Sequence, residues 1–305
     1  MTTPRVPVMF IHGLWLHPAS WQRWIGLFED AGYEATAPGW PGVPGTVAEA
    51  REHPERQAGT GIADATEHYA RIAGSAATGP VIVGHGLGGL IAQNLLGRGL
   101  AAAAVAIDPV PARGVLAFSP AQLRAAFPAW RNPANRNRPV SLTAAQFRYA
   151  FGNAVSERES AQLHDAWSIP APGRALFEAA FANLTPHSPA QVNTRNAARG
   201  PLLLISGQKD HAVPDSVTYA TSRQYRHSAA VTDLRQAASR GHSLTIDSGW
   251  HEIAGTVLNW LLIQTLRRPA GTSTAGPDRP DHPAREPGGW GLYWPEPDDH
   301  RSTPP

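Results

Sequence analysis

The sequence predicts an α/β fold: a doubly wound, mostly parallel sheet with helices on both faces and a helical cap inserted between the fourth and fifth strands. Two observations lead to this prediction. Short β-branched runs alternate with helix-length segments over residues 6–110, as crossover connections between parallel strands require. The alternation stops over residues 111–195, where prolines interrupt helical stretches, and it resumes near Leu202.

Six strands are expected, in chain order at residues 6–11, 34–37, 80–83, 103–107, 202–206 and 231–237. The third contains Val81, Ile82 and Val83, which are apolar on both faces, so this strand is expected at the centre of the sheet. A last helix is expected over residues 249–266, where it closes the final crossover.

These elements divide the chain into three parts. Residues 1–110 and 196–266 form the predicted core, and residues 111–195 form the predicted helical cap. Residues 267–305 hold nine prolines and no periodicity, so this tail is expected to be disordered. Trp290, Tyr293 and Trp294 are unusual for such a tail and suggest docking on the body or on a partner.

Composition excludes several classes of protein. The 305 residues are 42% hydrophobic, yet no apolar run approaches the ~20 residues that a membrane helix needs. The chain has no cysteine, which excludes disulfides, thiolate metal sites and a cysteine nucleophile. A net charge of +2 and a basic cluster without interleaved aromatics argue against nucleic acid. No secretory signal precedes the first strand, so a cytoplasmic protein is expected.

The strongest local motif is a glycine-rich turn between the third strand and a helix. Its sequence is Gly84-His85-Gly86-Leu87-Gly88-Gly89. Small residues two before and two after the apex of a sharp strand-to-helix turn are typical of a nucleophile elbow, G-x-S-x-G, and here Gly86 stands at the apex.

With this turn, the chain resembles the α/β-hydrolase superfamily, in particular its capped serine hydrolases, over about residues 6–266. His12-Gly13-Leu14-Trp15 follows the first strand, where the family has its oxyanion loop. Asp210, after a late strand, matches the family's acid, and His242, after the last strand, matches its base. The chain order of elbow, acid and histidine is the one that this fold uses.

Elementary chemistry supports the same roles. A histidine base needs a carboxylate on its far nitrogen, and loops at the carboxyl ends of parallel strands bring Asp210 and His242 together. The backbone N–H groups of Leu14 and Leu87 are expected to form an oxyanion hole. Cap aromatics favour an apolar pocket, and the residues expected to contact substrate are Trp15, His85, Trp130, Phe147 and Trp167. No histidine pair has a metal-binding helical spacing beside a third ligand, so no metal or other cofactor is predicted.

Gly86 departs from the family pattern, because it has no hydroxyl and no cysteine exists to replace it. Ser206 lies inside a strand and Ser243 directly follows the histidine, so neither is a substitute. The prediction is an enzyme acting on a small apolar carbonyl compound or ester, with His242 and Asp210 as general base and no covalent serine intermediate. Its reaction is either hydrolysis or a lyase- or cyclase-type step.

Three alternatives stay open. The chain could be a non-catalytic binder of a small apolar ligand, or a serine esterase inactivated at Gly86. The third arises because Gly84-x-Gly86-x-x-Gly89 also matches a dinucleotide fingerprint, with Asp108 about 20 residues on as the ribose-binding acid. That alternative predicts an NAD(P)-binding oxidoreductase. The sequence makes no prediction about oligomeric state.

Overall fold

The long strands form one parallel sheet. The structure is a computed structural model that describes residues 5–76, 78–117 and 119–264. The strand order is β2-β1-β3-β4-β7-β8, and every neighbouring pair is parallel. The strands are β1 (Pro7–Ile11), β2 (Glu34–Thr36), β3 (Val81–His85), β4 (Ala103–Ile107), β7 (Leu202–Gly207) and β8 (Thr232–Ala237). The predicted fold class and all six predicted strands are therefore confirmed.

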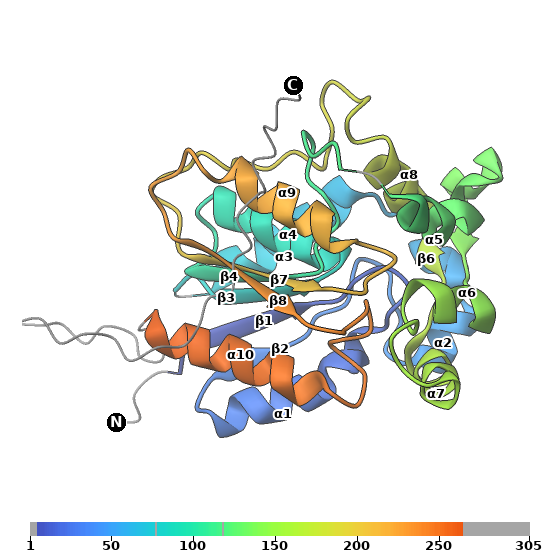
Figure 1. Cartoon of the computed structure of the whole chain (residues 1–305), viewed down its shortest axis with the longest axis horizontal. Helices are drawn as coiled ribbons and strands as arrows, with labels where there is room; N and C mark the ends of the chain where they lie inside the picture. Colours follow the sequence, from blue (N-terminus) through green and yellow to red (C-terminus); the bar gives the residue numbers. More distant parts are fainter. Residues whose placement is uncertain (1–4, 77, 118, 265–305) are drawn as a thin grey trace, which may run out of the picture. The chain divides into compact units, whose positions relative to one another are not determined.

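Helices cover both faces of this sheet (Figure 1). One face carries α1 (Gln22–Asp30) and α10 (Trp250–Ile263), and the other carries α3 (Ile62–Ser75), α4 (Leu87–Gly97) and α9 (Asp215–Gln224). Val81 and Val83 of β3 pack with α1 and α10, while Ile82 packs with α3 and α4. The apolar run of β3 is therefore buried on both sides, as expected for a central strand.

Three shorter helical elements lie in the connections between β1 and α1 and between β2 and α3. They are η1 (Pro18–Trp21), α2 (Val47–Glu52) and η2 (Pro54–Gln57). The ring of Trp21 stacks on Phe10 of β1 and the ring of Trp24 meets Phe10 edge-on, so the face of the sheet toward α1 is rich in aromatic rings.

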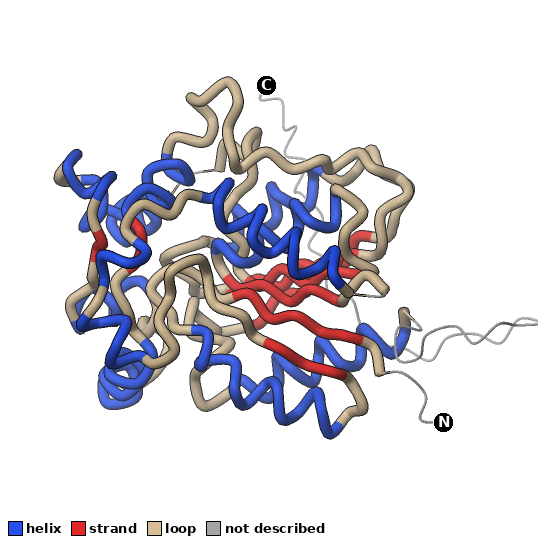
Figure 2. The backbone as a smooth tube through the Cα atoms, turned by 180° about the vertical axis from the view of Figure 1, so that it is seen from behind, coloured by secondary structure: helices blue, strands red, loops and turns tan. Residues whose placement is uncertain are grey.

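Between β4 and β7, helices gather at one end of the sheet (Figures 1 and 2). These cap helices are α5 (Pro120–Trp130), α6 (Ala144–Ala150), α7 (Glu157–Trp167) and α8 (Gly173–Ala180), with a turn η3 (Pro133–Asn137). The prediction that residues 111–195 hold no strand is wrong in one detail, since β5 (Pro139–Val140) and β6 (Ala171–Pro172) pair antiparallel. Two residues are too few to show a strand periodicity.

Two further expectations concern membrane helices and the aromatic residues of the tail. In the described ranges, no helix has both the length and the apolar character needed to cross a bilayer. The tail residues Trp290, Tyr293 and Trp294 lie outside the described residues.

Candidate active site

The glycine-rich turn has the backbone geometry of an elbow. Gly86 has φ 56° and ψ −118°, and α4 begins at the next residue. A Cβ on Gly84 would lie 2.1 Å from the carbonyl oxygen of Gly88, and one on Gly88 would lie 2.2 Å from that of Ile11. Close packing of α4 on the strands therefore requires glycine at positions 84 and 88, and the positive φ favours glycine at position 86. This packing explains the glycine spacing without a bound nucleotide.

Asp108 also argues against a dinucleotide site. It directly follows β4 and its side chain is fully buried. Its Oδ1 accepts a 2.6 Å hydrogen bond from the Gly207 N–H group. A ribose hydroxyl cannot reach this carboxyl group, so the nucleotide-binding alternative loses the acid on which it depended.

His242 and Asp210 form a buried pair. Nδ1 of His242 lies 2.5 Å from Oδ2 of Asp210, and the other Asp210 oxygen accepts the N–H groups of Ala212 (2.6 Å) and Val213 (2.8 Å). Nε2 of His242 lies 3.4 Å from the position where a side chain on Gly86 would have its Cβ. The structure therefore brings together the acid, the histidine and the apex of the elbow.

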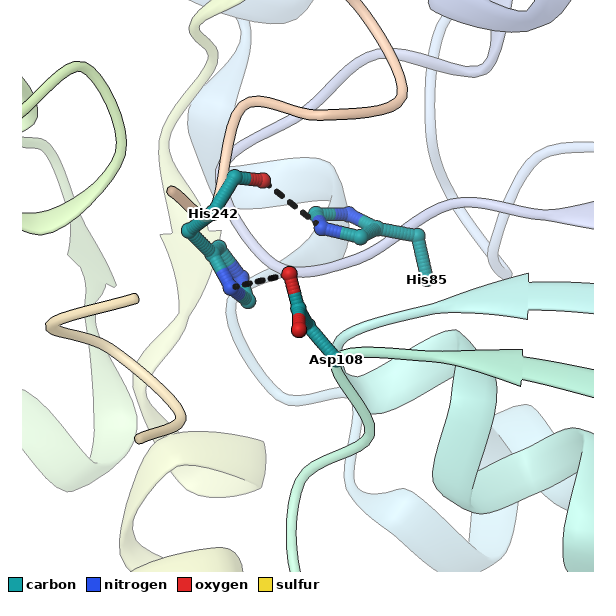
Figure 3. A group of neighbouring side chains, drawn as sticks. All are labelled: His85, Asp108 and His242. Atoms are coloured by element: carbon teal, nitrogen blue, oxygen red, sulfur yellow. Dashed lines mark hydrogen bonds and ion pairs between the residues drawn. The ribbon is translucent and has the colours of Figure 1, made fainter. Parts of the chain in front are cut away.

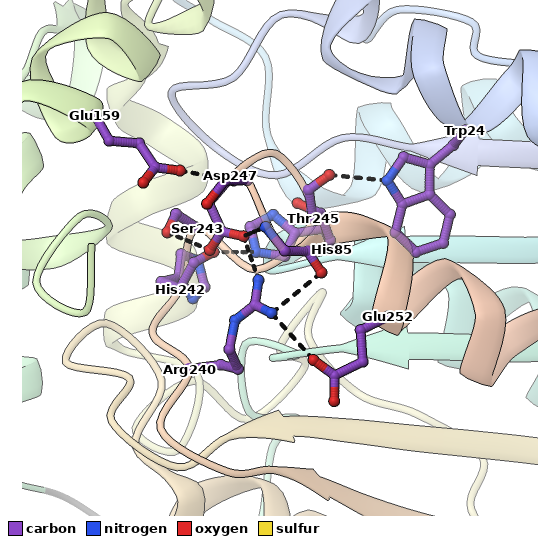
Figure 4. Close-up of polar contacts among 11 residues, drawn as sticks. Trp24, His85, Glu159, Arg240, His242, Ser243, Thr245, Asp247 and Glu252 are labelled. Atoms are coloured by element: carbon purple, nitrogen blue, oxygen red, sulfur yellow. Dashed lines mark hydrogen bonds and ion pairs between the residues drawn. The ribbon is translucent and has the colours of Figure 1, made fainter. Parts of the chain in front are cut away.

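A polar network fixes the loop that carries His242 (Figure 4). Arg240 pairs with Asp247 and donates to the Gly249 carbonyl at 3.1 Å. The Ser243 hydroxyl donates to the same aspartate at 3.0 Å. Because its hydroxyl is used here, Ser243 does not face the elbow, and Ser206 is fully buried in β7.

Burial sets the proton affinities of the pair. It raises the pKa of Asp210 to about 8 and lowers the pKa of His242 to about 4. Both shifts disfavour an ion pair of imidazolium and carboxylate in this site. The two groups titrate as a coupled pair, in which loss of one proton leaves Asp210 ionised, Nδ1 protonated and Nε2 free to act as a base.

His85, Asp108 and His242 form a second buried cluster around the same ring (Figure 3). One ligand atom from each residue lies within 4.8 Å of the others, a spacing that could hold a metal ion. However, Nδ1 of His242 is bonded to Asp210, and Nε2 of His85 donates to the His242 carbonyl at 3.0 Å. A metal at either of these two nitrogens would have to displace a hydrogen bond, whereas Nδ1 of His85 and Oδ2 of Asp108 have no hydrogen-bond partner among the described residues.

An apolar cavity of about 130 Å³ opens in front of His242 and Gly86. No aspartate, glutamate, lysine or arginine lines it. Of the predicted site residues, those in its lining are Leu14, Trp15, Gly86, Leu87, Trp130 and His242. The cap contributes further lining residues that sequence reasoning missed, including Gln122, Ala150, Phe151, Leu176 and Ala179.

Leu14 and Leu87, the two residues predicted to form the oxyanion hole, both line this cavity. Leu87 is the first residue of α4, where N–H groups lack intrahelical partners. Within the ranges that the structure describes, no hydrogen bond uses either N–H group. Both groups remain available to a ligand oxygen.

A model of the alpha/beta hydrolase family matches residues 8–256, which is most of the chain. The chain belongs to the alpha/beta hydrolase family. Among curated protein sequences, none is significantly similar to it.

Solved structures share this alpha/beta hydrolase fold at low sequence identity. A monoacylglycerol lipase from Paleococcus ferrophilus has a TM-score of 0.59 and 18% identity, covering 87% of this chain and all of its own. An extracellular alpha/beta-hydrolase from a Paenibacillus species has a TM-score of 0.62 and 17% identity, covering 83% and 98%. A methylesterase from Arabidopsis has a TM-score of 0.59 and 14% identity, covering 85% and 99%.

Three of the residues predicted to contact substrate, His85, Phe147 and Trp167, do not line this cavity. His85 lies behind His242, with ring centroids 4.4 Å apart, and is absent from the cavity lining. Phe147 is fully buried and stacks on Phe151, and Trp167 packs on the same cap cluster. Phe147 and Phe151 are four residues apart and therefore stack on one another, and of the two only Phe151 lines the cavity.

Proposed function

We propose that this alpha/beta hydrolase family member is an enzyme acting on a small apolar carbonyl compound or ester, with His242 as general base and no covalent serine intermediate. One observation carries the proposal. Nε2 of His242 lies 3.4 Å from the Cβ position of Gly86, at the wall of a cavity without charged residues. A substrate group bound there comes within reach of the base.

The neighbouring groups supply the other parts of the mechanism. Asp210 accepts the Nδ1 proton of His242 and so directs the basic lone pair of Nε2 toward the cavity. The N–H groups of Leu14 and Leu87 stabilise the negative oxygen that develops on the carbonyl as an oxyanion or enolate. None of these roles requires a side chain at Gly86.

Magnitudes favour a proton transfer over slow ester hydrolysis. General base catalysis contributes about 10² to 10⁴ in rate, and it needs no nucleophile on the protein. A serine triad adds about 10⁶ to an ester hydrolysis, and this site lacks the serine on which that gain depends. A lyase- or cyclase-type step begins with removal of a proton next to a carbonyl, for which this site has a base. Such a step therefore suits the site better than ester hydrolysis, for which the site lacks a nucleophile.

The substrate class follows from the cavity and from the relatives. A lining of alanine, leucine, valine and aromatic side chains favours an apolar body with one polar carbonyl group. The monoacylglycerol lipase and the methylesterase are named for esters, which carry such a carbonyl. The cap helices supply much of this lining, so we assign them the role of a cap over the substrate.

Two reactions test the proposal with defined probes. In heavy water, wild type should speed deuterium uptake at the methyl group of acetophenone, and it should hydrolyse phenyl acetate weakly. His242→Ala should lower both rates to background, while the matched variant His251→Ala, on an exposed histidine, should not. Binding of acetophenone with both rates at background in wild type would favour the non-catalytic binder and overturn the proposal.

The inactivated serine esterase is distinguished by the balance between the two reactions. It predicts no deuterium uptake in wild type, together with strong ester hydrolysis once a serine is placed at residue 86. Deuterium uptake that depends on His242 in wild type would exclude it, because the proton transfer would then work without the hydroxyl.

A further inference from the structure

Asp108 occupies a strained and fully buried place directly after β4. Its φ is +43°, and in the described ranges only Trp15 and Ser239 are other non-glycine residues with positive φ. Such backbone costs on the order of 1 kcal/mol or more and persists where the surroundings enforce it. The Asp108 N–H group donates to the Ile205 carbonyl at 2.8 Å, and Oδ1 of Asp108 accepts from the Gly207 N–H group. Hydrogen bonds from β7 therefore fix both the backbone and the side chain of Asp108.

The second oxygen of Asp108 has no ordinary partner. Oδ2 is buried, accepts no hydrogen bond, and lies 3.9 Å from Nδ1 of His242, beyond hydrogen-bonding distance. No lysine or arginine forms an ion pair with Asp108 in the described part of the chain. An ionised Asp108 would thus be a buried carboxylate with one unsatisfied oxygen beside the carboxyl group of Asp210.

A protonated Asp108 resolves this conflict. Its hydroxyl group would face the Asp210 carboxylate, because Oδ2 of each aspartate lies beside the same Nδ1 atom of His242, at 3.9 Å for Asp108 and 2.5 Å for Asp210. Burial, followed by the nearby charge of Asp210, raises the pKa of Asp108 well above its usual value. A hydrogen bond from Asp108 lowers the pKa of Asp210 and so opposes the effect of burial on that group.

We propose that Asp108 is a positioning residue that keeps a proton and donates it in a hydrogen bond to Asp210, so that Asp108, Asp210 and His242 act as one array. In this array Asp210 accepts from the Ala212 and Val213 amides, from His242 and from Asp108. These donors favour the ionised form of Asp210, which the proposed general base requires. The role given to Asp108 rests on the proposed function of His242 as a general base, whereas the titration that tests it does not.

Other titratable groups near the His242 ring do not compete for this role. His85, at the end of β3, packs on the ring, and burial holds its pKa well below the usual value, so it is neutral. On the loop of His242, Asp247 is paired with Arg240. The carboxyl groups that face the ring are therefore Asp108 and Asp210, and in the proposed array only Asp210 changes its charge.

The test is a titration of His242 followed by ¹⁵N NMR of the full chain labelled at histidine, with His242→Gln to assign the signals. Asp108→Asn keeps a hydrogen-bond donor and the shape, so the apparent pKa of the pair should stay within a few tenths of the wild-type value. Asp108→Leu removes the donor and should raise that pKa by about one, the size expected for one hydrogen bond to a charged group. Asp165→Asn makes the same chemical change on an exposed carboxyl group and should have no effect.

Two results would overturn the proposal. A fall of about one in the Asp108→Asn variant would show that Asp108 is ionised, because a negative charge beside the ring would have been removed. Wild-type values in both Asp108→Asn and Asp108→Leu would show that the residue only supports the backbone at Gly207. Asp108→Ala replaces the leucine variant where the larger side chain prevents folding. Because the titration needs no substrate, failure here is distinct from failure of His242 as a catalyst.

Discussion

A serine at residue 86 should convert the site into a conventional esterase. The new Cβ would lie 3.4 Å from Nε2 of His242 and 3.7 Å from Cα of Gly13, so it meets no backbone atom at a forbidden distance. The hydroxyl group, one bond further out, can reach Nε2, and the carboxylate of Asp210 is already in place. We expect Gly86→Ser to hydrolyse 4-nitrophenyl acetate at least about 10²-fold faster than wild type, well below the ~10⁶ that a full triad contributes.

The same substitution should lower stability, because φ at residue 86 is 56°. A side chain there costs about 1 to 3 kcal/mol, and the reduced entropy of the unfolded chain offsets about 0.4 to 1 kcal/mol. The melting temperature should therefore fall by a few degrees in differential scanning calorimetry.

Gly86→Ala is the matched control for both effects. It carries the same backbone strain without a hydroxyl group, so it should melt near the serine variant and show no gain in hydrolysis. Labelling by a fluorophosphonate probe should occur in the serine variant alone. The reasoning is refuted if the serine variant is no faster than the alanine variant and remains unlabelled.

Three further predictions follow from the same geometry. Asp210→Asn keeps the shape but loses control of the His242 tautomer, and by analogy with serine proteases the rate of deuterium uptake should fall by up to about 10⁴; an unchanged rate would contradict the role of the pair. Burial raises the pKa of Asp210 to about 8 and lowers that of His242 to about 4, so the form with ionised Asp210 and a free Nε2 on His242 gains population as pH rises. The rate of deuterium uptake should therefore increase through about pH 8. A rate that is flat from pH 6 to 9 would contradict the role of this pair as the base. Gly88→Ala places a Cβ 2.2 Å from the Ile11 carbonyl oxygen and should lower the free energy of unfolding by several kcal/mol. Gly26→Ala, at an open position of α1, should raise that free energy by about 0.5 to 1 kcal/mol. Urea unfolding of both variants checks the contrast.

The central strands of the sheet were predictable because β1, β3, β4 and β7 are short apolar runs, whereas the edge strands β2 and β8 are more polar. The pairing of Asp210 with His242 was also predictable, because the carboxyl ends of parallel strands meet at one edge of a sheet. Both inferences need only the order of elements along the chain.

The role of Asp108 could not be predicted in the same way. It approaches Asp210 because β4 and β7 are neighbours, although the helices of the cap separate them in the sequence. The sequence showed an acid at the end of the fourth strand, but the glycine spacing before it indicated that Asp108 binds a ribose and did not indicate a contact with a second carboxyl group. Likewise, only the packing of α6 decides that Phe151, and not Phe147, faces the cavity.

A crystal structure of the wild-type protein with acetophenone tests the central claim most directly, because it locates the carbonyl group relative to the proposed base. The ketone oxygen should lie within hydrogen-bonding distance of the Leu14 and Leu87 N–H groups, with its methyl carbon facing Nε2 of His242. A ketone bound with its oxygen toward the cap helices and its methyl group away from His242 would contradict the claim.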